Sequence, residues 1–170
     1  LGDSITEGSP SCVNPDDHAH SVSYRKALWD KLVAAGYKFE YVGSRSLGGA
    51  ILSDSDNEGH GGWCADGCSS SYGDILTSVY GFLVNNPADV VLLHIGTNDL
   101  GAGSANASEV SGILDEIYRY GRDQNRDIWV ILALIIHQAD PPCSLCSETA
   151  SYNNAVRQMA QSRIQNGDKI

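Results

Sequence analysis

The sequence predicts an α/β fold, a three-layer α/β/α sandwich in which helices cover both faces of a parallel sheet. Short apolar runs alternate along the chain with longer segments whose apolar residues recur at helical spacing. Two of these runs, 89–95 and 128–136, are almost continuously apolar, as strands are when both of their faces are buried. No repeat or linker divides the 170 residues, so we expect one domain over residues 1–170.

The first half of the chain supplies three expected elements and a long loop. We interpret Leu1–Ser4 as the end of a strand that runs into a glycine-containing loop. Residues 24–35 place apolar side chains on one helical face and are followed by Gly36, a good helix terminator. Residues 39–42 are aromatic and β-branched and predict a strand. Residues 43–71, rich in Gly, Ser, Asp and Asn, predict a long loop of the kind that often carries function.

The second half continues the alternation of helices and strands. In order, we expect a helix over 75–83, a buried strand over 89–95, a helix capped by Ser108, a buried strand over 128–136, a loop over 137–147, a helix containing Val156 and Ile164, and the start of a strand at 168–170. Because the first and last strands are only partly present, we interpret the domain as truncated at both ends. Its βαβ connections should be right-handed.

The charge balance excludes two classes of partner. Eleven Lys and Arg residues stand against 21 Asp and Glu residues, which gives a net charge of −10. Nucleic acids and anionic membrane surfaces both require basic patches. The longest apolar run, 128–136, is far shorter than a membrane-spanning helix. We therefore expect neither nucleic acid nor membrane as a partner.

Five cysteines bear on compartment and metal binding. Cys64 and Cys68 form one close pair, Cys143 and Cys146 form another, and Cys12 stands alone. Such pairs form disulfides, remain free thiols or bind zinc. A domain of this size can fold without a structural metal, so we expect no metal and favour a bridge within each pair. Disulfides in turn indicate a secreted protein.

Three polar motifs follow expected strands. They are GDSITEG at 2–8, EGHGGW at 58–63 and GTND at 96–99. Each alone is compatible with an ordinary strand-ending turn. Together they should meet at the carboxyl edge of the sheet, where open α/β sheets bind ligands. A serine hydroxyl, glycine N–H groups and an asparagine amide are the parts of an acyl-transfer site with an oxyanion hole.

These motifs resemble those of the SGNH (GDSL-type) hydrolases, a family named for its Ser, Gly, Asn and His residues. Ser4 matches the nucleophile, Gly62 matches the glycine whose N–H enters the oxyanion hole, and Asn98 matches the asparagine whose amide enters the same hole. The resemblance spans residues 1–170. It implies a flavodoxin-like SGNH hydrolase fold and a serine esterase without a cofactor.

A softer resemblance concerns the subfamily. Residues 58–63, with SYR at 23–25 and YVGS at 41–44, are most similar to carbohydrate esterase family three, the acetylxylan esterases. This resemblance implies a secreted, monomeric enzyme that deacetylates a polysaccharide through an acyl-enzyme intermediate. The alternatives are a lipid or thioester hydrolase of the same superfamily and a non-catalytic carbohydrate-binding relative.

The chain departs from the family at the fourth block, an Asp-x-x-His that supplies the general base and its orienting acid. Nothing after Asn98 matches this block. Asp17 and His20 have the right letters and spacing, but they follow the nucleophile, where the family does not place its base. A serine hydroxyl is a weak nucleophile without a base. We therefore expect the base to lie outside these residues or another histidine to replace it.

Further residues have both functional and structural interpretations. His60, Trp63 and Asp3 are the weaker substrate-binding candidates: His60 as a cleft residue, Trp63 as a wall for a sugar ring, and Asp3 through its place beside the nucleophile. The alternatives are a loop histidine, an anchor for the loop and a structural carboxylate. We expect His94 to be a core histidine with satisfied hydrogen bonds, whereas His137 ends a strand near enough to the cleft to contact a substrate.

Overall fold

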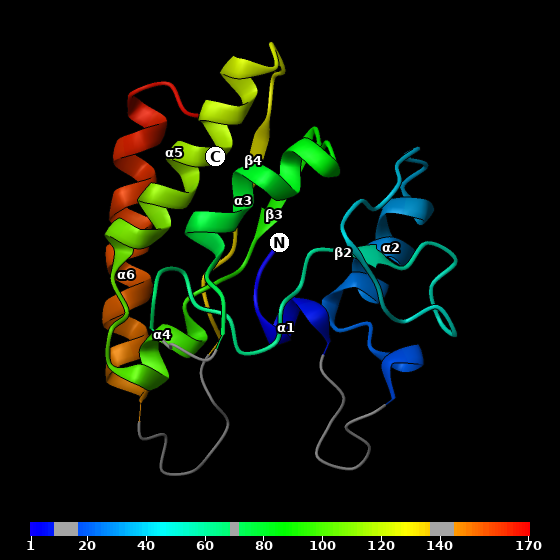
Figure 1. Ribbon diagram of the computed structural model, residues 1–170, viewed down its shortest axis with the longest axis horizontal. Coiled ribbons are helices and arrows are strands. Elements are labelled where there is room, and N and C mark those ends of the chain that lie inside the picture. The colour runs from blue at the N-terminus through cyan, green and yellow to red at the C-terminus, as the bar shows by residue number, and fades with distance from the viewer. Residues whose placement is uncertain (9–16, 69–71, 137–144) are drawn as a thin grey trace.

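The computed structural model describes residues 1–8, 17–68, 72–136 and 145–170 (Figure 1). Its elements alternate between helices and short strands. In chain order they are α1 (Ser4–Glu7), a 3₁₀ helix (His18–His20), α2 (Tyr24–Ala34), β1 (Arg45–Ser46), β2 (Asp56–Asn57), α3 (Ile75–Asn85), β3 (Val90–Leu93), α4 (Thr97–Ala102), α5 (Ala107–Asp123), β4 (Trp129–Leu132) and α6 (Cys146–Gln165).

A parallel sheet forms the centre of the molecule. β3 pairs with β4 in parallel, with Val91 opposite Val130. On the other side of β3, Gly2 makes parallel bridges to both His94 and Gly59. Beyond β4, the N–H of Val130 donates to the carbonyl of Lys169 at 2.8 Å. The order of these segments across the sheet is therefore second, first, third, fourth and fifth, the flavodoxin-like order.

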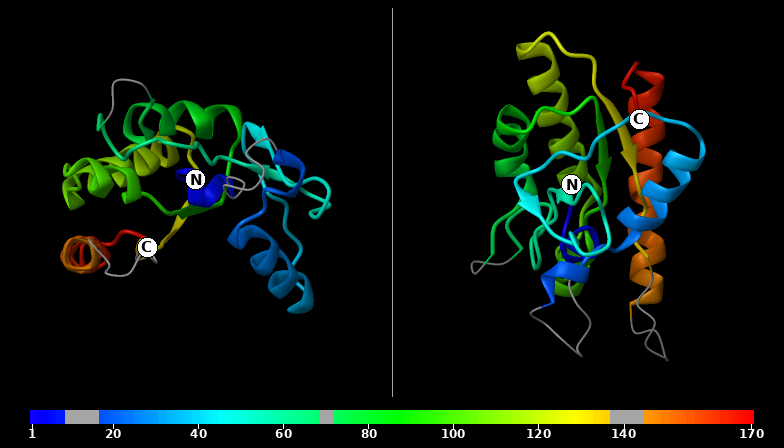
Figure 2. Two further views of the ribbon diagram at one scale, coloured as in Figure 1. Left: turned by 90° about the horizontal axis from the view of Figure 1, so that it is seen from below. Right: turned by 90° about the vertical axis from the view of Figure 1, so that its right-hand side faces the viewer.

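Helices lie on both sides of this sheet, as the sequence predicts. α5 and α6 lie on one side of the strands and α2 on the other (Figure 2). Together with α3, the first two helices cover a core that includes the alternate strand residues Val91, Leu93 and Val130. The opposite strand face carries Val90 and Ile131, which are 50% and 57% exposed and border a cavity of about 750 Å³ beneath α2. β3 and β4 are therefore less buried on this face than the sequence predicts.

Helix α5 follows its predicted apolar spacing closely. Val110, Ile113, Leu114 and Ile117 recur three or four residues apart and are all buried against α3 and α6. The predicted cap is wrong by two residues. Asn106 caps the helix by accepting from the N–H of Ser108 at 3.0 Å, because its side chain lies just before the first helical turn.

The predicted strand at 39–42 is wrong. Phe39 and Tyr41 instead pack edge-on against Trp29 of α2, with ring centroids 4.7 and 5.4 Å away. The N–H of Tyr41 donates to the carboxylate of Asp54 rather than to a strand. Aromatic residues favour strands only where a strand neighbour is available to pair with them.

Two other segments depart from their predictions in smaller ways. The long loop contains the two-residue strands β1 and β2, which pair antiparallel. Residues 168–170 are not a regular strand, although Lys169 bonds to β4. In the part of the chain that the structure describes, no helix is both long and apolar enough to cross a membrane.

Candidate active site

The three polar motifs leave the sheet at one edge. Gly2 is paired in parallel with Gly59 on one side and His94 on the other, so the residues that follow all three emerge together. Ser4 comes two residues after Gly2, Gly62 three residues after Gly59, and Asn98 four residues after His94. This edge is the carboxyl end of the strands, where ligands bind in open α/β folds.

Ser4 begins the short helix α1 and is half-buried. The side chain of Asp3 caps the helix by accepting from the N–H of Ile5 at 2.9 Å. Gly8 ends the helix at φ +76°, and its N–H donates to the carbonyl of Ser4. Asp3 is 0% exposed, so its carboxylate shapes the serine turn and does not reach a substrate.

Arg25 stabilises the serine turn through hydrogen bonds from its guanidinium. The residue is buried, with only 4% of its surface exposed. It donates to five backbone carbonyls, those of Thr6, Glu7, Ser21, Leu47 and Ser55. Two of these belong to α1 and two to the segment around β1 and β2, so Arg25 ties the serine turn to the long loop. Sequence reasoning noted Arg25 only as part of SYR, because its acceptors are scattered along the chain.

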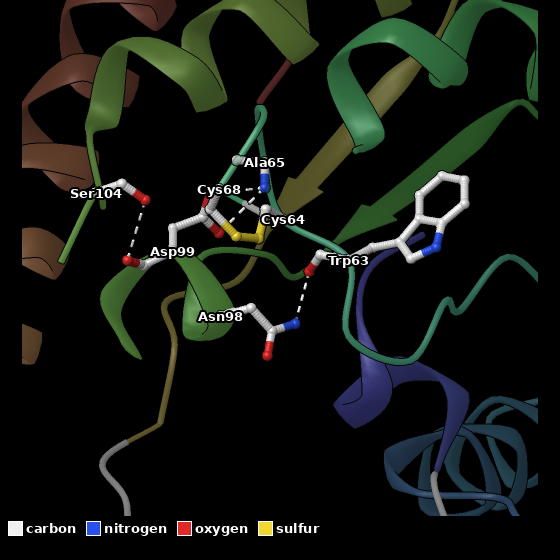
Figure 3. The surroundings of a disulfide bond; sticks show 7 residues. All are labelled: Trp63, Cys64, Ala65, Cys68, Asn98, Asp99 and Ser104. Atoms are coloured by element: carbon white, nitrogen blue, oxygen red, sulfur yellow. Dashed lines mark hydrogen bonds between the residues drawn. A yellow bond between two sulfur atoms is a disulfide. The ribbon is translucent and has the colours of Figure 1, made fainter. Parts of the chain in front are cut away.

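Asn98 lies in the first turn of α4, beside the loop that contains Gly62 and Trp63 (Figure 3). Its Nδ2 donates to the carbonyl of Trp63 at 2.6 Å. A side-chain amide carries two N–H hydrogens, so the second can serve another acceptor. Gly62 has φ +79°, a conformation that favours glycine, and its N–H belongs to the same loop.

A disulfide follows directly on this loop. Cys64 and Cys68 are joined, with their Cα atoms 5.8 Å apart, as the sequence predicts. Among the described residues, the one group of three potential metal ligands consists of these two cysteines and Asp99. Because the sulfurs are bonded to each other, they offer no thiolates to a metal. Cys12 and Cys143 lie outside the described residues, and so does the predicted bridge from Cys143 to Cys146.

His60 is held inside the protein rather than in a cleft. Its Nε2 lies 2.6 Å from Oε1 of Glu58, and its ring stacks on those of both Trp63 and Phe82, with centroids 4.2 and 4.9 Å away. Glu58 also accepts from the N–H and the hydroxyl of Ser44. Burial alone would raise the pKa of Glu58, but the hydrogen bonds from His60 and Ser44 outweigh it and lower that pKa. His60 therefore supports the loop that carries Gly62, and its contact with a substrate stays a prediction.

The remaining histidines occupy contrasting environments. His94 is buried in the core as predicted, and burial lowers its pKa. The prediction of a histidine with satisfied hydrogen bonds is wrong, because neither ring nitrogen has a hydrogen-bond partner among the described residues. His20 is 58% exposed in its side chain, and its Nδ1 lies 2.7 Å from a carboxylate oxygen of Asp17. The side chains of Asp17 and His20 are therefore paired, and the pair lies on the protein surface. His137 lies outside the described residues.

Two aromatic side chains flank Gly62. The ring of Trp63 packs on His60 and on the backbone of Gly73, so it anchors the loop. Tyr72 is 59% exposed, and a Cβ placed on Gly62 would lie only 3.0 Å from its ring. The more exposed of the two aromatic side chains is Tyr72, which sequence reasoning missed. The sequence feature that could have indicated Tyr72 is its position as an aromatic residue at the end of the long polar loop.

Comparisons with known proteins match nearly the whole chain. The family model of GDSL-like lipases and acylhydrolases matches residues 1–166. A family 3 carbohydrate esterase of Clostridium thermocellum superposes with a TM-score of 0.78 at 28% sequence identity, covering 99% of this chain and 72% of that one. No curated protein matches the chain.

Two further solved structures are similar. A carbohydrate esterase family 3 protein from Talaromyces cellulolyticus matches with a TM-score of 0.65 at 26% identity, covering 95% of this chain and 70% of that one. A mutant acetyl esterase crystallised with an acetate ion matches with a TM-score of 0.64 at 25% identity, covering 98% of this chain and 71% of that one. The similarity to these structures therefore extends over nearly the whole chain.

Proposed function

Since the chain belongs to the GDSL-like lipase/acylhydrolase family and is a carboxylic ester hydrolase similar to carbohydrate esterases, we propose that it removes acetyl groups from a polysaccharide such as xylan. The observation that carries this proposal is the hydrogen bond from Asn98 to the carbonyl of Trp63. It brings the GTND motif against the GHGGW motif at the edge of the sheet where Ser4 begins its helix.

In the proposed reaction, Ser4 Oγ attacks the carbonyl carbon of an acetyl ester. The carbonyl oxygen becomes an oxyanion, which accepts from the N–H groups of Ser4 and Gly62 and from the second Nδ2 hydrogen of Asn98. The C–O bond to the sugar then breaks, and the departing sugar oxygen takes the proton that the general base removed from Ser4. Water attacks the acetyl-serine with help from the same base, which releases acetate and restores Ser4.

Two observations support an acetylated sugar as the substrate. Tyr72 presents an exposed ring beside Gly62, and an aromatic ring can cover the apolar face of a pyranose. The disulfide between Cys64 and Cys68 is typical of proteins in oxidising, extracellular compartments, where plant polysaccharides are found. We accordingly propose that the enzyme is secreted.

The decisive experiment compares three substrates for a form of the enzyme that contains its general base: acetylated xylan, p-nitrophenyl acetate and p-nitrophenyl octanoate. We expect acetate release from xylan, and turnover of the acetate ester roughly tenfold or more above that of the octanoate ester. Ser4→Ala should abolish both acetate-releasing reactions without changing the circular dichroism spectrum. Preference for the octanoate would indicate a lipid esterase, and xylan binding without hydrolysis would indicate a non-catalytic relative.

A further inference from the structure

Two hydrogen bonds of opposite direction join the loop after Gly62 to the start of α4 (Figure 3). Asn98 Nδ2 donates to the carbonyl of Trp63 at 2.6 Å. In return, the N–H of Ala65 donates to both carboxylate oxygens of Asp99, at 2.9 and 3.1 Å. The loop contributes an acceptor and a donor, and the helix contributes the matching side chains from adjacent residues. This reciprocal pair leaves little freedom for either segment to shift against the other.

The disulfide lies between these two bonds in the chain. Cys64 stands between Trp63 and Ala65, is buried and is joined to Cys68. The carbonyls of Cys64 and Ala65 accept from the first N–H groups of α3, those of Ile75 and Leu76, each at 3.0 Å. The segment is therefore fixed to α3 by its backbone, to α4 by Asp99, and to its own continuation by the disulfide.

Asp99 is held by burial and by its hydrogen bonds. It is 0% exposed, and burial raises the pKa of its carboxyl while the bond from Ala65 opposes that rise. A buried acceptor that loses its donor is costly, so the bond to Ala65 strongly favours a single position of the loop.

We propose that Asp99 and the Cys64–Cys68 disulfide are positioning groups of the oxyanion hole, a proposal that rests on the roles proposed above for Gly62 and Asn98. When the Trp63 carbonyl is held in place, one Nδ2 hydrogen of Asn98 is used in the hydrogen bond to it. Because the amide is planar, this bond also fixes the direction in which the other Nδ2 hydrogen points. It also fixes the peptide unit next to Gly62. Oxyanion donors must lie close to 3 Å from one developing charge, and a small misplacement costs much of their effect.

A spectroscopic test reads the position of Asn98 without requiring any hydrolysis. The side-chain amide of Asn98 is observed by NMR in ¹⁵N-labelled protein, together with the rate at which its hydrogens exchange with water. We expect roughly tenfold faster exchange, and altered shifts, in Asp99→Leu and in the double variant Cys64→Ala/Cys68→Ala. Asp99→Asn keeps a side-chain oxygen as acceptor and should remain close to the wild type.

Ser104→Ala provides a matched control. The Ser104 hydroxyl donates to the backbone carbonyl of Asp99 at 3.3 Å, so its removal disturbs the same helix without touching the reciprocal pair. We expect the Asn98 signals of this variant to be unchanged. If Asp99→Leu does not fold, the double cysteine variant decides the question. Wild-type Asn98 signals in the folded double variant, and in Asp99→Leu where that variant folds, would overturn the proposal.

A kinetic measurement on a form of the enzyme that contains its general base complements the spectra. Asp99→Leu should lower kcat on p-nitrophenyl acetate by roughly tenfold while KM changes by less than about twofold, because the oxyanion develops only in the transition state. A rise in KM alone would contradict a positioning role. If Asn98 responds as expected but even the wild type hydrolyses no acetyl ester, Asp99 and the disulfide still position Asn98, and it is the proposed function that fails.

Discussion

The imidazole of His60 shares a hydrogen bond of 2.6 Å with the carboxylate of Glu58, inside the loop that carries Gly62. A histidine paired with a carboxylate is the usual arrangement of a general base. Here, however, the ring is buried and packs against the rings of both Trp63 and Phe82. The pair therefore supports the loop that carries Gly62.

The substitution His60→Phe tests this supporting role. The new ring keeps the stacking but leaves Glu58 without one of its donors, so we predict a loss of about 1–3 kcal/mol in the free energy of unfolding. Urea denaturation at pH 7 measures it. Ser44→Ala, which leaves the Ser44 N–H on Glu58, should cost less. Abolished esterase activity with unchanged stability would instead identify His60 as a catalytic residue.

A second prediction concerns the oxyanion hole itself. Asn98→Ala should lower kcat by roughly 10²-fold or more with little change in KM, because its amide would bind a charge that exists only in the transition state. Steady-state kinetics with p-nitrophenyl acetate measure both constants. Asn154→Ala, on the exposed side of α6, is the control. An increase in KM alone would make Asn98 a substrate-binding residue.

Local sequence patterns predicted those parts of the fold that depend on local spacing. The apolar residues of α5 lie on one face, and the motifs that contain Ser4, Gly62 and Asn98 leave one edge of the sheet. Both results follow from periodicity and from the parallel order of strands. The disulfide between Cys64 and Cys68 was also predictable from the local sequence, because the two cysteines are only four residues apart.

Features that depend on distant residues were not predictable in this way. Phe39 and Tyr41 have strand propensity, but they pack on α2. Arg25 donates hydrogen bonds to backbone carbonyls of residues up to 30 positions away in the sequence. Asn106 and Ser108 are both residue types that cap helices well. Asn106 is the cap because α5 begins at Ala107. In each case the deciding partner is set by tertiary structure, which no local pattern contains.

A third prediction concerns pH and Glu109, near the start of α5. Burial, together with the charges of Asp99 and Asp66, raises its pKa from 4.5 to about 7. A carboxyl whose pKa is raised on folding contributes stability that is complete below about pH 4.5 and is lost as the pH rises through about 7. We predict a fall in Tm between pH 5 and pH 7.5 that Glu109→Gln reduces. Exposed Glu40→Gln is the control, and an equal effect of both variants would contradict the assignment.

A fourth prediction separates polysaccharide binding from ester chemistry. Tyr72→Ala should raise KM for acetylated xylan severalfold while leaving p-nitrophenyl acetate hydrolysis nearly unchanged, because only the sugar chain is long enough to use the exposed ring. Tyr37→Ala removes an equally exposed ring outside the candidate site and is the control. Equal losses on both substrates in Tyr72→Ala would mean that the ring only holds Gly62 in place.

The last prediction addresses the general base. A serine hydroxyl is almost wholly protonated at neutral pH, and its activation requires a base within hydrogen-bond distance. Among the described histidines, His60 and His94 are buried, and the family's Asp-x-x-His block has no match after Asn98. The Asp17–His20 pair is exposed and has the geometry of an oriented base, but it precedes the position that the family gives it.

We therefore predict that residues 1–170 alone hydrolyse p-nitrophenyl acetate slowly, and that a chain extended to an Asp-x-x-His block is fully active. Oxyanion donors and substrate binding without a base leave roughly 10³-fold acceleration over water. Both lengths are compared, each with and without His20→Ala. If the base lies in the extension, His20→Ala changes neither form. Full activity of residues 1–170 that is lost in His20→Ala would instead assign the base to His20 and its orientation to Asp17, because their side chains are already paired at 2.7 Å.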